Sequence, residues 1–112
     1  MAAPPGFAST RITTMFTGTL VLDLLLPPDS RSLKAKRGYV RPVVAALRRL
    51  EVAAAEVGAV ELLGRAEIGV AAVSGDARHV REVLDACERL VAGRPELELL
   101  AARRNLHSTE DE

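Results

Sequence analysis

Aromatic side chains are nearly absent from this chain of 112 residues, which has no tryptophan, two phenylalanines and one tyrosine. Proteins that recognise unpaired nucleic-acid bases often stack those bases on exposed aromatic rings. Here Phe7 lies in a terminal segment, Phe16 falls on the expected core side of a strand, and Tyr39 is the third aromatic. The composition therefore argues against recognition by base stacking on a β-sheet.

Cysteine and long apolar runs are also scarce. Cys87 is the one cysteine, which excludes an internal disulfide and fits a reducing compartment. The longest apolar run, at residues 20–26, is interrupted by Asp23 and is too short to cross a bilayer. The N-terminal residues lack the charged start and apolar stretch of a signal peptide. We therefore expect a cytoplasmic protein without membrane association.

Lysine is rare as well, since Lys34 and Lys36 are the two lysines among 15 basic residues, and the formal net charge is zero. A neutral chain has no overall electrostatic attraction to nucleic acid. The basic residues are unevenly distributed, however, because seven of them lie in residues 31–49, which contain no acidic residue. This distribution indicates a local basic surface on an otherwise neutral protein.

The apolar pattern predicts six elements of secondary structure. Alternating apolar residues indicate strands, and the 3.6-residue period indicates helices. Ser32 is the expected N-cap of the first helix. Pro42 is expected either to kink this helix or to leave it regular only after Tyr39. Ser74 or Asp76 caps the second helix, and Gly93 ends it. The predicted strands are residues 16–26, 52–57, 65–73 and 97–103. The first predicted helix runs from Ser32 to about Leu50, and the second runs from residues 74–76 to Gly93.

These elements follow the order β-α-β-β-α-β, which is the ferredoxin-like arrangement of the α+β class. Right-handed crossovers then give a four-stranded antiparallel sheet of strand order 4-1-3-2, with both helices on one face. The length is that of one such domain. We expect this domain at residues 15–106, with a disordered leader at 1–14 and an acidic tail at 107–112.

Two segments carry a resemblance to a known family: Ser-Leu-Lys-Ala-Lys-Arg at 32–37 and Arg-Ala-Glu-Ile-Gly-Val-Ala at 65–71. With the surrounding pattern over roughly residues 15–106, the chain resembles the YlxP-like bacterial family, a domain of unknown function (503). The resemblance implies a ferredoxin-like cytoplasmic protein with no agreed enzymatic activity. Because genes of this family often lie among translation and ribosome-maturation genes, it also implies an RNA or ribosome hypothesis. Many relatives carry a His, an Asp and an aromatic in the loop that is residues 59–64 here, and this chain lacks them.

The first predicted helix is the best candidate for a binding site. Positive charge at a helix N-terminus is locally unfavourable, and local rules of this kind tend to be broken where a binding partner compensates for the cost. Exposed N–H groups of a first turn, together with ammonium groups, suit an anion such as phosphate. On a helical wheel, four of the basic residues fall within about 60° of each other. We predict contacts with RNA or ribosomal phosphates, and the alternative is a solvated polar face. The predicted binding residues are Lys34, Lys36, Arg37, Arg41, Arg48 and Arg49.

Lys36 differs from the others because it falls near the apolar side of the wheel. We expect either that its stem lies over the end of the sheet or that its ammonium pairs with a carboxylate such as Asp23 or Glu67.

The sheet face that the helices leave uncovered is the second candidate surface. Thr17, Thr19 and Val21 are expected there, and the last strand is expected to add Glu98, Leu100 and Ala102 to it. Such a face of small residues suits packing against a flat partner. The alternative function is therefore a homo-oligomeric interaction module without a nucleic-acid role, and a partly solvated face is the remaining interpretation.

Catalytic, metal and cofactor sites are not expected. His79 and His107 lie in a first helical turn and in the tail, and Cys87 is on a core stripe. Glu56 and Glu67, on neighbouring strands, could form an acid–base pair, but charged strand surfaces are common. The sequence has no metal-ligand spacing, Gly-rich phosphate loop or nucleophile elbow. A third interpretation is an enzyme whose active site lies in a cleft between subunits, but the sequence offers no identifiable nucleophile or base for it.

Overall fold

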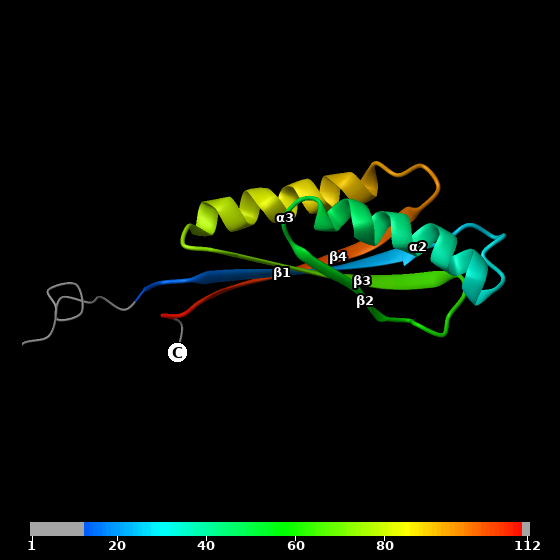
Figure 1. Cartoon of the computed structure of the whole chain (residues 1–112), viewed down its shortest axis with the longest axis horizontal. Helices are drawn as coiled ribbons and strands as arrows, with labels where there is room; N and C mark the ends of the chain where they lie inside the picture. The colour runs from blue at the N-terminus through cyan, green and yellow to red at the C-terminus, as the bar shows by residue number, and fades with distance from the viewer. Residues whose placement is uncertain (1–12, 111–112) are drawn as a thin grey trace, which may run out of the picture.

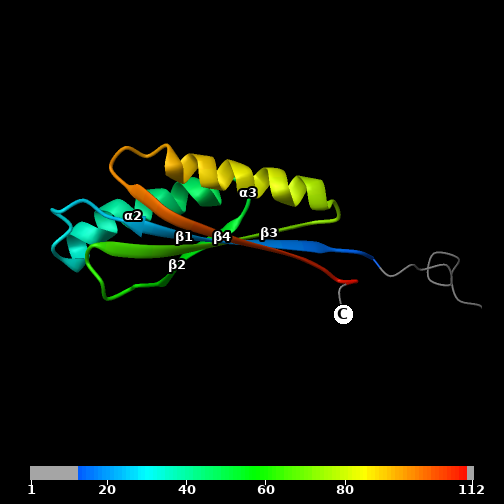
Figure 2. The ribbon, with the colours of Figure 1, turned by 180° about the vertical axis from the view of Figure 1, so that it is seen from behind.

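The computed structural model describes residues 13–110, and this part of the chain contains the six predicted elements in the predicted order (Figure 1, Figure 2). The leader predicted at 1–14 lies outside the described residues except for its last two positions, and residues 111–112 of the tail also lie outside them. The elements are β1 (Phe16–Leu25), α2 (Leu33–Arg48), β2 (Ala53–Gly58), β3 (Arg65–Ser74), α3 (Ala77–Ala92) and β4 (Glu98–Ser108).

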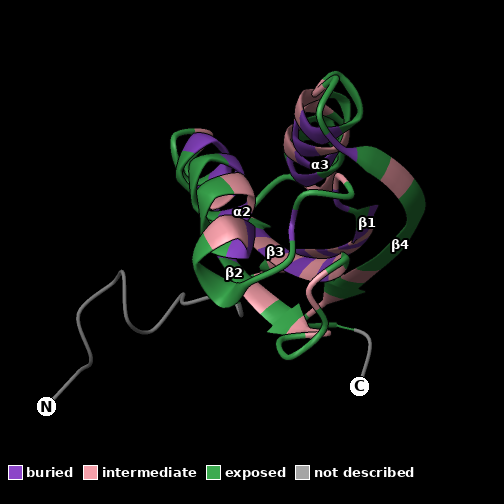
Figure 3. Ribbon diagram, turned by 90° about the vertical axis from the view of Figure 1, so that its right-hand side faces the viewer, coloured by how far each residue is buried: buried purple, intermediate pink, exposed green. Residues whose placement is uncertain are grey.

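The sheet has the strand order β2-β3-β1-β4, so β1 lies in the middle and β2 and β4 form the two edges. All three strand pairings are antiparallel. Both helices cover the same face of the sheet (Figure 3). The structure therefore confirms the predicted ferredoxin-like α+β fold and its strand order 4-1-3-2.

The hydrophobic core lies between the sheet and the two helices. Leu20 and Leu22 of β1 and Ile68 of β3 are fully buried, and they cluster with Val43 of α2 and Leu84 of α3. Alternate residues of β1 and β3 face this core because successive side chains of a strand point to opposite faces. The other face of the sheet is uncovered by helices, and we refer to it as the open face.

Side-chain caps fix the starts of both helices. The Ser32 hydroxyl accepts a hydrogen bond from the Ala35 N–H at 3.0 Å, as predicted for α2. Asp76, the second of the two predicted candidates, caps α3 by accepting from the Arg78 N–H at 2.9 Å. Helix α2 continues through Pro42 and ends at Arg48.

Strand β4 differs from its prediction, because it extends past Arg103 to Ser108. The register of β4 against β1 shifts between Asp23 and Leu24, and Ala102 then pairs with Leu22. Since Leu22 faces the core, Ala102 lies on the helix side, and its predicted place on the open face is wrong. After the shift, β4 presents other residues on the open face, namely Ala101, Arg103, Asn105 and His107.

Candidate nucleic-acid interface

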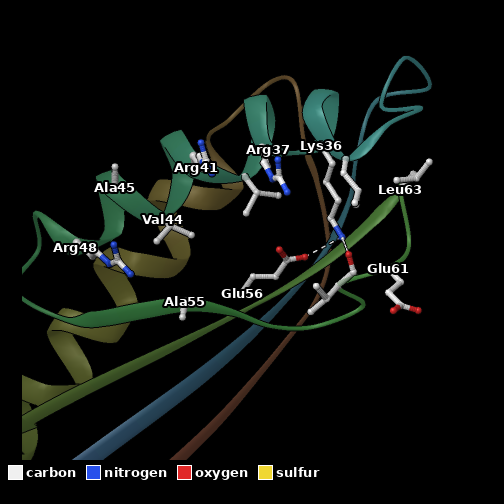
Figure 4. A pocket seen from close by; sticks show the side chains of 13 residues that line it. Lys36, Arg37, Arg41, Val44, Ala45, Arg48, Ala55, Glu56, Glu61 and Leu63 are labelled. Carbon is white, nitrogen blue, oxygen red and sulfur yellow. Dashed lines mark hydrogen bonds and ion pairs between the residues drawn. The ribbon is translucent and has the colours of Figure 1, made fainter.

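A groove of about 1050 Å³ lies between α2 and β2, with the β2–β3 loop at one end (Figure 4). We refer to it as the α2–β2 groove. Four basic and two acidic residues line it, which gives a net charge of +2, and the rest of the lining is apolar. The charged lining residues are Lys36, Arg37, Arg41, Arg48, Glu56 and Glu61. The apolar lining includes Leu33, Val40 and Val44 of α2, and Val60 and Leu63 of the loop.

The three arginines of the groove are exposed, and none of them forms an ion pair within residues 13–110. The guanidinium groups of Arg37 and Arg48 turn toward the groove, whereas that of Arg41 turns away from β2 (Figure 4). At a helical rise of about 1.5 Å per residue, Arg37 and Arg48 lie about 16 Å apart along α2. The arginines therefore place uncompensated positive charge along the length of the groove.

Arg48 also contacts the backbone of the neighbouring strand. Its Nε donates a hydrogen bond to the Ala54 carbonyl at 3.1 Å. Because a carbonyl carries no net charge, this bond positions the guanidinium over β2 without neutralising it. The contact fixes the position of one positive group at the end of the groove far from the loop.

Lys34 and Arg49 are exposed on α2 and its C-cap, outside the groove lining. Neither forms an ion pair with any residue that the structure describes. Together with the arginines of the groove they form what we call the basic surface of α2: Lys34, Arg37, Arg41, Arg48 and Arg49. Five of the six predicted binding residues thus share one exposed region.

Lys36, the sixth predicted residue, is turned into the protein and is 3 % exposed. Its ammonium donates to the carbonyls of Ala59 and Leu62, each at 2.7 Å, and to that of Val60 at 3.1 Å. The Glu56 carboxylate lies 2.8 Å from the same nitrogen and balances its charge. Three N–H donors thus meet three carbonyls, so no donor is left for a phosphate, and we leave Lys36 out of the basic surface.

The carboxylate partner of Lys36 also differs from the prediction. Asp23 or Glu67 was the expected partner, whereas Glu56 is the observed one. Asp23 instead accepts two hydrogen bonds from Arg65, at 2.7 and 2.8 Å. The reason is the facing of the strands: Glu56 pairs with the buried Ile68 and so faces the helices, whereas Asp23 and Glu67 pair with each other on the open face.

The β2–β3 loop is held in place by its backbone. Besides the three bonds from Lys36, the Ser30 hydroxyl donates to the Leu63 carbonyl at 2.6 Å, and the Gly64 carbonyl accepts from the Leu26 N–H at 2.9 Å. Ala59 has a positive φ of 57°, a conformation that side-chain-bearing residues seldom adopt. These polar anchors fix the end wall of the groove, although the loop sequence is mostly apolar.

The open face carries a shallower apolar depression of about 440 Å³. The side chain of Val57 lies over Gly69. A Cβ atom added to Gly69 would be 2.7 Å from Cγ1 of Val57. Val57 and Val73 are 58 % and 63 % exposed, which leaves apolar side chains in solvent on this face. The sequence predicted such a face of small residues, and the depression is lined by Thr19, Leu20, Val21, Ala53, Ala54, Ala55, Val57, Gly69, Val70 and Ala71.

The residues weighed for catalysis are spread over the molecule. Cys87 is fully buried, and burial raises the pKa of its thiol, so the reactive thiolate is disfavoured. Glu56 and Glu67 lie on opposite faces of the sheet and form no acid–base pair. His79 is exposed on α3 and His107 lies on the open face of β4. Within residues 13–110, no group of three His, Cys, Asp or Glu side chains is arranged to hold a metal, and no helix is long and apolar enough to span a membrane.

Sequence reasoning missed the loop side of the groove. The groove lining opposite α2 includes three residues of the loop, Val60, Glu61 and Leu63. From the sequence, this loop was distinguished only by lacking the His, Asp and aromatic residues of many relatives. The nearest available signal was the position of Lys36 on the apolar side of the helical wheel, which implied an inward ammonium. It did not identify the carbonyls of the loop as its partners.

Residues 17–104 match the family model described as a protein of unknown function, DUF503. The matched residues run from β1 into β4 and include all of α2 and the β2–β3 loop. The match is consistent with the family resemblance of the two sequence segments at 32–37 and 65–71. Among curated proteins, no match to the chain is found.

Proposed function

The chain belongs to the DUF503 family, and we propose that it is a small non-catalytic protein that binds RNA or the ribosome through the basic surface of α2. One observation carries this proposal: five exposed positive groups have no acidic partner among residues 13–110. Neighbouring like charges on a helix disfavour folding. A polyanion that neutralises them relieves this repulsion.

The chemistry of the surface favours phosphate groups as ligands. Arginine presents several N–H donors in a planar fork that fits phosphate oxygens. A protein that contacts phosphates releases condensed counterions, so its affinity falls as the salt concentration rises. In this proposal Lys34 and Arg37 bind phosphate near the start of α2, where unpaired N–H groups add to the attraction, and Arg41, Arg48 and Arg49 extend the contact.

The test is salt-titrated binding of the purified protein to ribosomal subunits and to unstructured RNA. We expect binding that weakens steeply with salt and that is lost in a Lys34→Glu/Arg37→Glu variant. The matched control is Arg81→Glu/Arg89→Glu, which changes the charge equally at two exposed positions of α3 that form no ion pair within the described part of the chain. Unchanged binding by the α2 variant, or equal loss in both variants, would contradict the proposal.

A second candidate function is self-association of two copies through the open face. It is favoured by the apolar depression and by the exposed Val57 and Val73. Light scattering coupled to size-exclusion chromatography tests it, and a Val57→Glu variant adds a charge at the centre of the depression. A monomer at high protein concentration would count against this candidate, as would a dimer that Val57→Glu leaves intact.

A further inference from the structure

We infer that the RNA bound by this protein is single-stranded and lies in the α2–β2 groove, an inference that rests on the proposed function. The groove offers positive and apolar surface side by side, and these two surfaces match the phosphates and the unpaired bases of a single strand. The three groove arginines offer positive charge, and Val44 of α2 and Val60 of the loop offer apolar surface. Of the two acidic lining residues, Glu56 is neutralised by Lys36, and Glu61 lies in the loop, so the net charge of the lining stays positive. A single strand presents phosphates together with unpaired bases, whose faces are apolar.

A duplex fits this groove poorly. Its outer surface consists of phosphates and sugars, and its base faces are stacked on each other and hidden. A duplex could contact Lys34 and Arg49, which lie outside the groove lining, but it would leave the apolar walls of the groove exposed to water. The guanidinium groups of Arg37 and Arg48 turn toward the groove, which favours a strand that enters between helix and sheet (Figure 4).

An added peptide strand fits less well than RNA, although β2 is an edge strand. Strand addition needs a regular row of unpaired backbone groups. Arg48 already occupies the Ala54 carbonyl, and the register of β2 shifts between Glu56 and Gly58. Short edges with irregular pairing and covering charges resist strand addition. The exposed arginines therefore point to an anionic chain that binds through its phosphates.

The composition of the groove also predicts the character of the binding. No aromatic residue lines it, so bases are held by apolar contact without stacking on rings, and the binding has little sequence preference. Three phosphate contacts on a single strand give a slope of log affinity against log salt of about −2, from about 0.7 per contact. Burial of apolar groove surface that a duplex cannot reach favours the single strand, and about 1.4 kcal/mol of such burial corresponds to a tenfold difference in affinity.

The first experiment compares a labelled 12-nucleotide oligouridylate with an RNA duplex of 12 base pairs by fluorescence anisotropy, on the full chain. We expect the single strand to bind about tenfold more tightly, with the salt slope given above. Equal or tighter binding of the duplex would overturn the inference and leave the proposed function standing. If the protein binds neither these RNAs nor ribosomal subunits, the proposed function itself fails.

The second experiment places the strand inside the groove by changing its far wall. Val60 is 55 % exposed and belongs to the loop, so Val60→Glu adds a repelling charge opposite the arginines while every residue of α2 stays unchanged. Val73→Glu is the control, because Val73 is as exposed but lies on the open face. We expect Val60→Glu alone to weaken binding of the oligouridylate, by about fivefold or more at low salt. Loss of binding in a Lys34→Gln/Arg49→Gln variant, whose two positions lie outside the groove lining, with no effect of Val60→Glu would place the RNA on the outer side of α2 and overturn the inference.

Discussion

The two helices are equally long, at 16 residues each, but they differ in charge and in how they pack on the sheet. Helix α3 has three arginines and three acidic residues, and its acids pair with Arg78 and with Arg104 of β4. Helix α2 has five basic residues and no acidic one. Helix α3 packs so closely that Gly18 is required beneath it, whereas α2 leaves a groove of about 1050 Å³ over β2. One helix completes the fold, and the other leaves charge and space for a ligand.

A second contrast lies within α2 itself. Lys34 and Lys36 are two residues apart, and Lys34 is exposed while Lys36 is buried among backbone carbonyls. The inward lysine neutralises Glu56 and fixes the loop that closes the groove. The same basic segment thus supplies a buried structural cation and an exposed lysine of the basic surface of α2, and the two can be changed separately by substitution.

The largest effect is expected from Lys36→Met, which removes the ammonium and leaves Glu56 and three carbonyls without their partner. Breaking a buried ion pair from one side destabilises a protein by about 3 kcal/mol or more, and the partial exposure of Glu56 favours the lower end. Urea unfolding measures this difference. A Lys36→Met/Glu56→Gln variant should regain part of the loss, because the unpaired carboxylate is then removed.

Lys34→Met is the matched control for that measurement. Because Lys34 is exposed and forms no ion pair within residues 13–110, its substitution should change stability by less than about 0.5 kcal/mol. Equal urea midpoints for the Lys36 and Lys34 variants would show that the inward lysine has no structural role.

A smaller effect is expected from Gly18→Ala, which tests how closely α3 is packed. The new methyl group would overlap with the side chains of Val80 and Leu84, and such overpacking costs about 1–3 kcal/mol. Gly38→Ala is the opposite case on α2, because a Cβ at Gly38 meets nothing within 4 Å. That change should stabilise the protein by about 0.5–1 kcal/mol. Thermal unfolding of both variants measures these changes in stability. A Gly18→Ala protein as stable as the parent would show that α3 is not packed more closely on the sheet than α2.

The smallest effect on stability is expected from Ala45→Glu, which makes α2 resemble α3. Ala45 is exposed, and a carboxylate there would lie one turn from both Arg41 and Arg49. Such pairs stabilise a helix by about 0.2–0.5 kcal/mol each. The same change should weaken RNA binding, because it neutralises part of the basic surface. Binding that improves or is unchanged in Ala45→Glu would indicate that these charges do not serve a polyanion, and Ala45→Gln controls for size.

Much of the fold could be predicted from the sequence because the apolar periods are regular. Leu20, Leu22 and Leu24 alternate on one strand, and Val43 and Leu47 follow the helical period, so burial on a single side was already specified. The strand order followed from the element order and the handedness of crossovers. The full extent of β4 could not be predicted, because Arg103, Arg104 and Asn105 lack an apolar alternation and are held by pairing with β1.

The candidate site was predictable on one side only. The basic residues of α2 share a face by helical geometry, so their clustering could be read from their spacing. The groove depends also on where the β2–β3 loop lies, and this depends on the bonds from Lys36 and Ser30 to loop carbonyls. Because every residue has a backbone carbonyl, residue types do not show which carbonyls will accept such hydrogen bonds. For the same reason Glu56 could not be chosen over Asp23 and Glu67 as the partner of Lys36.

The central place of β1 has a consequence for synthesis of the chain. Its two neighbours in the sheet are β3 and β4, and its Phe16 pairs with Ser74 and with Ser108. During synthesis one edge of β1 therefore stays unpaired until residues 65–74 of β3 have been made, and the other edge stays unpaired until residues 98–108 of β4 have been made. Contacts between such distant residues slow folding, and an apolar strand with open edges is prone to aggregate in the meantime. Expression of this protein should accordingly be sensitive to the rate of translation and to chaperones that shield nascent strands.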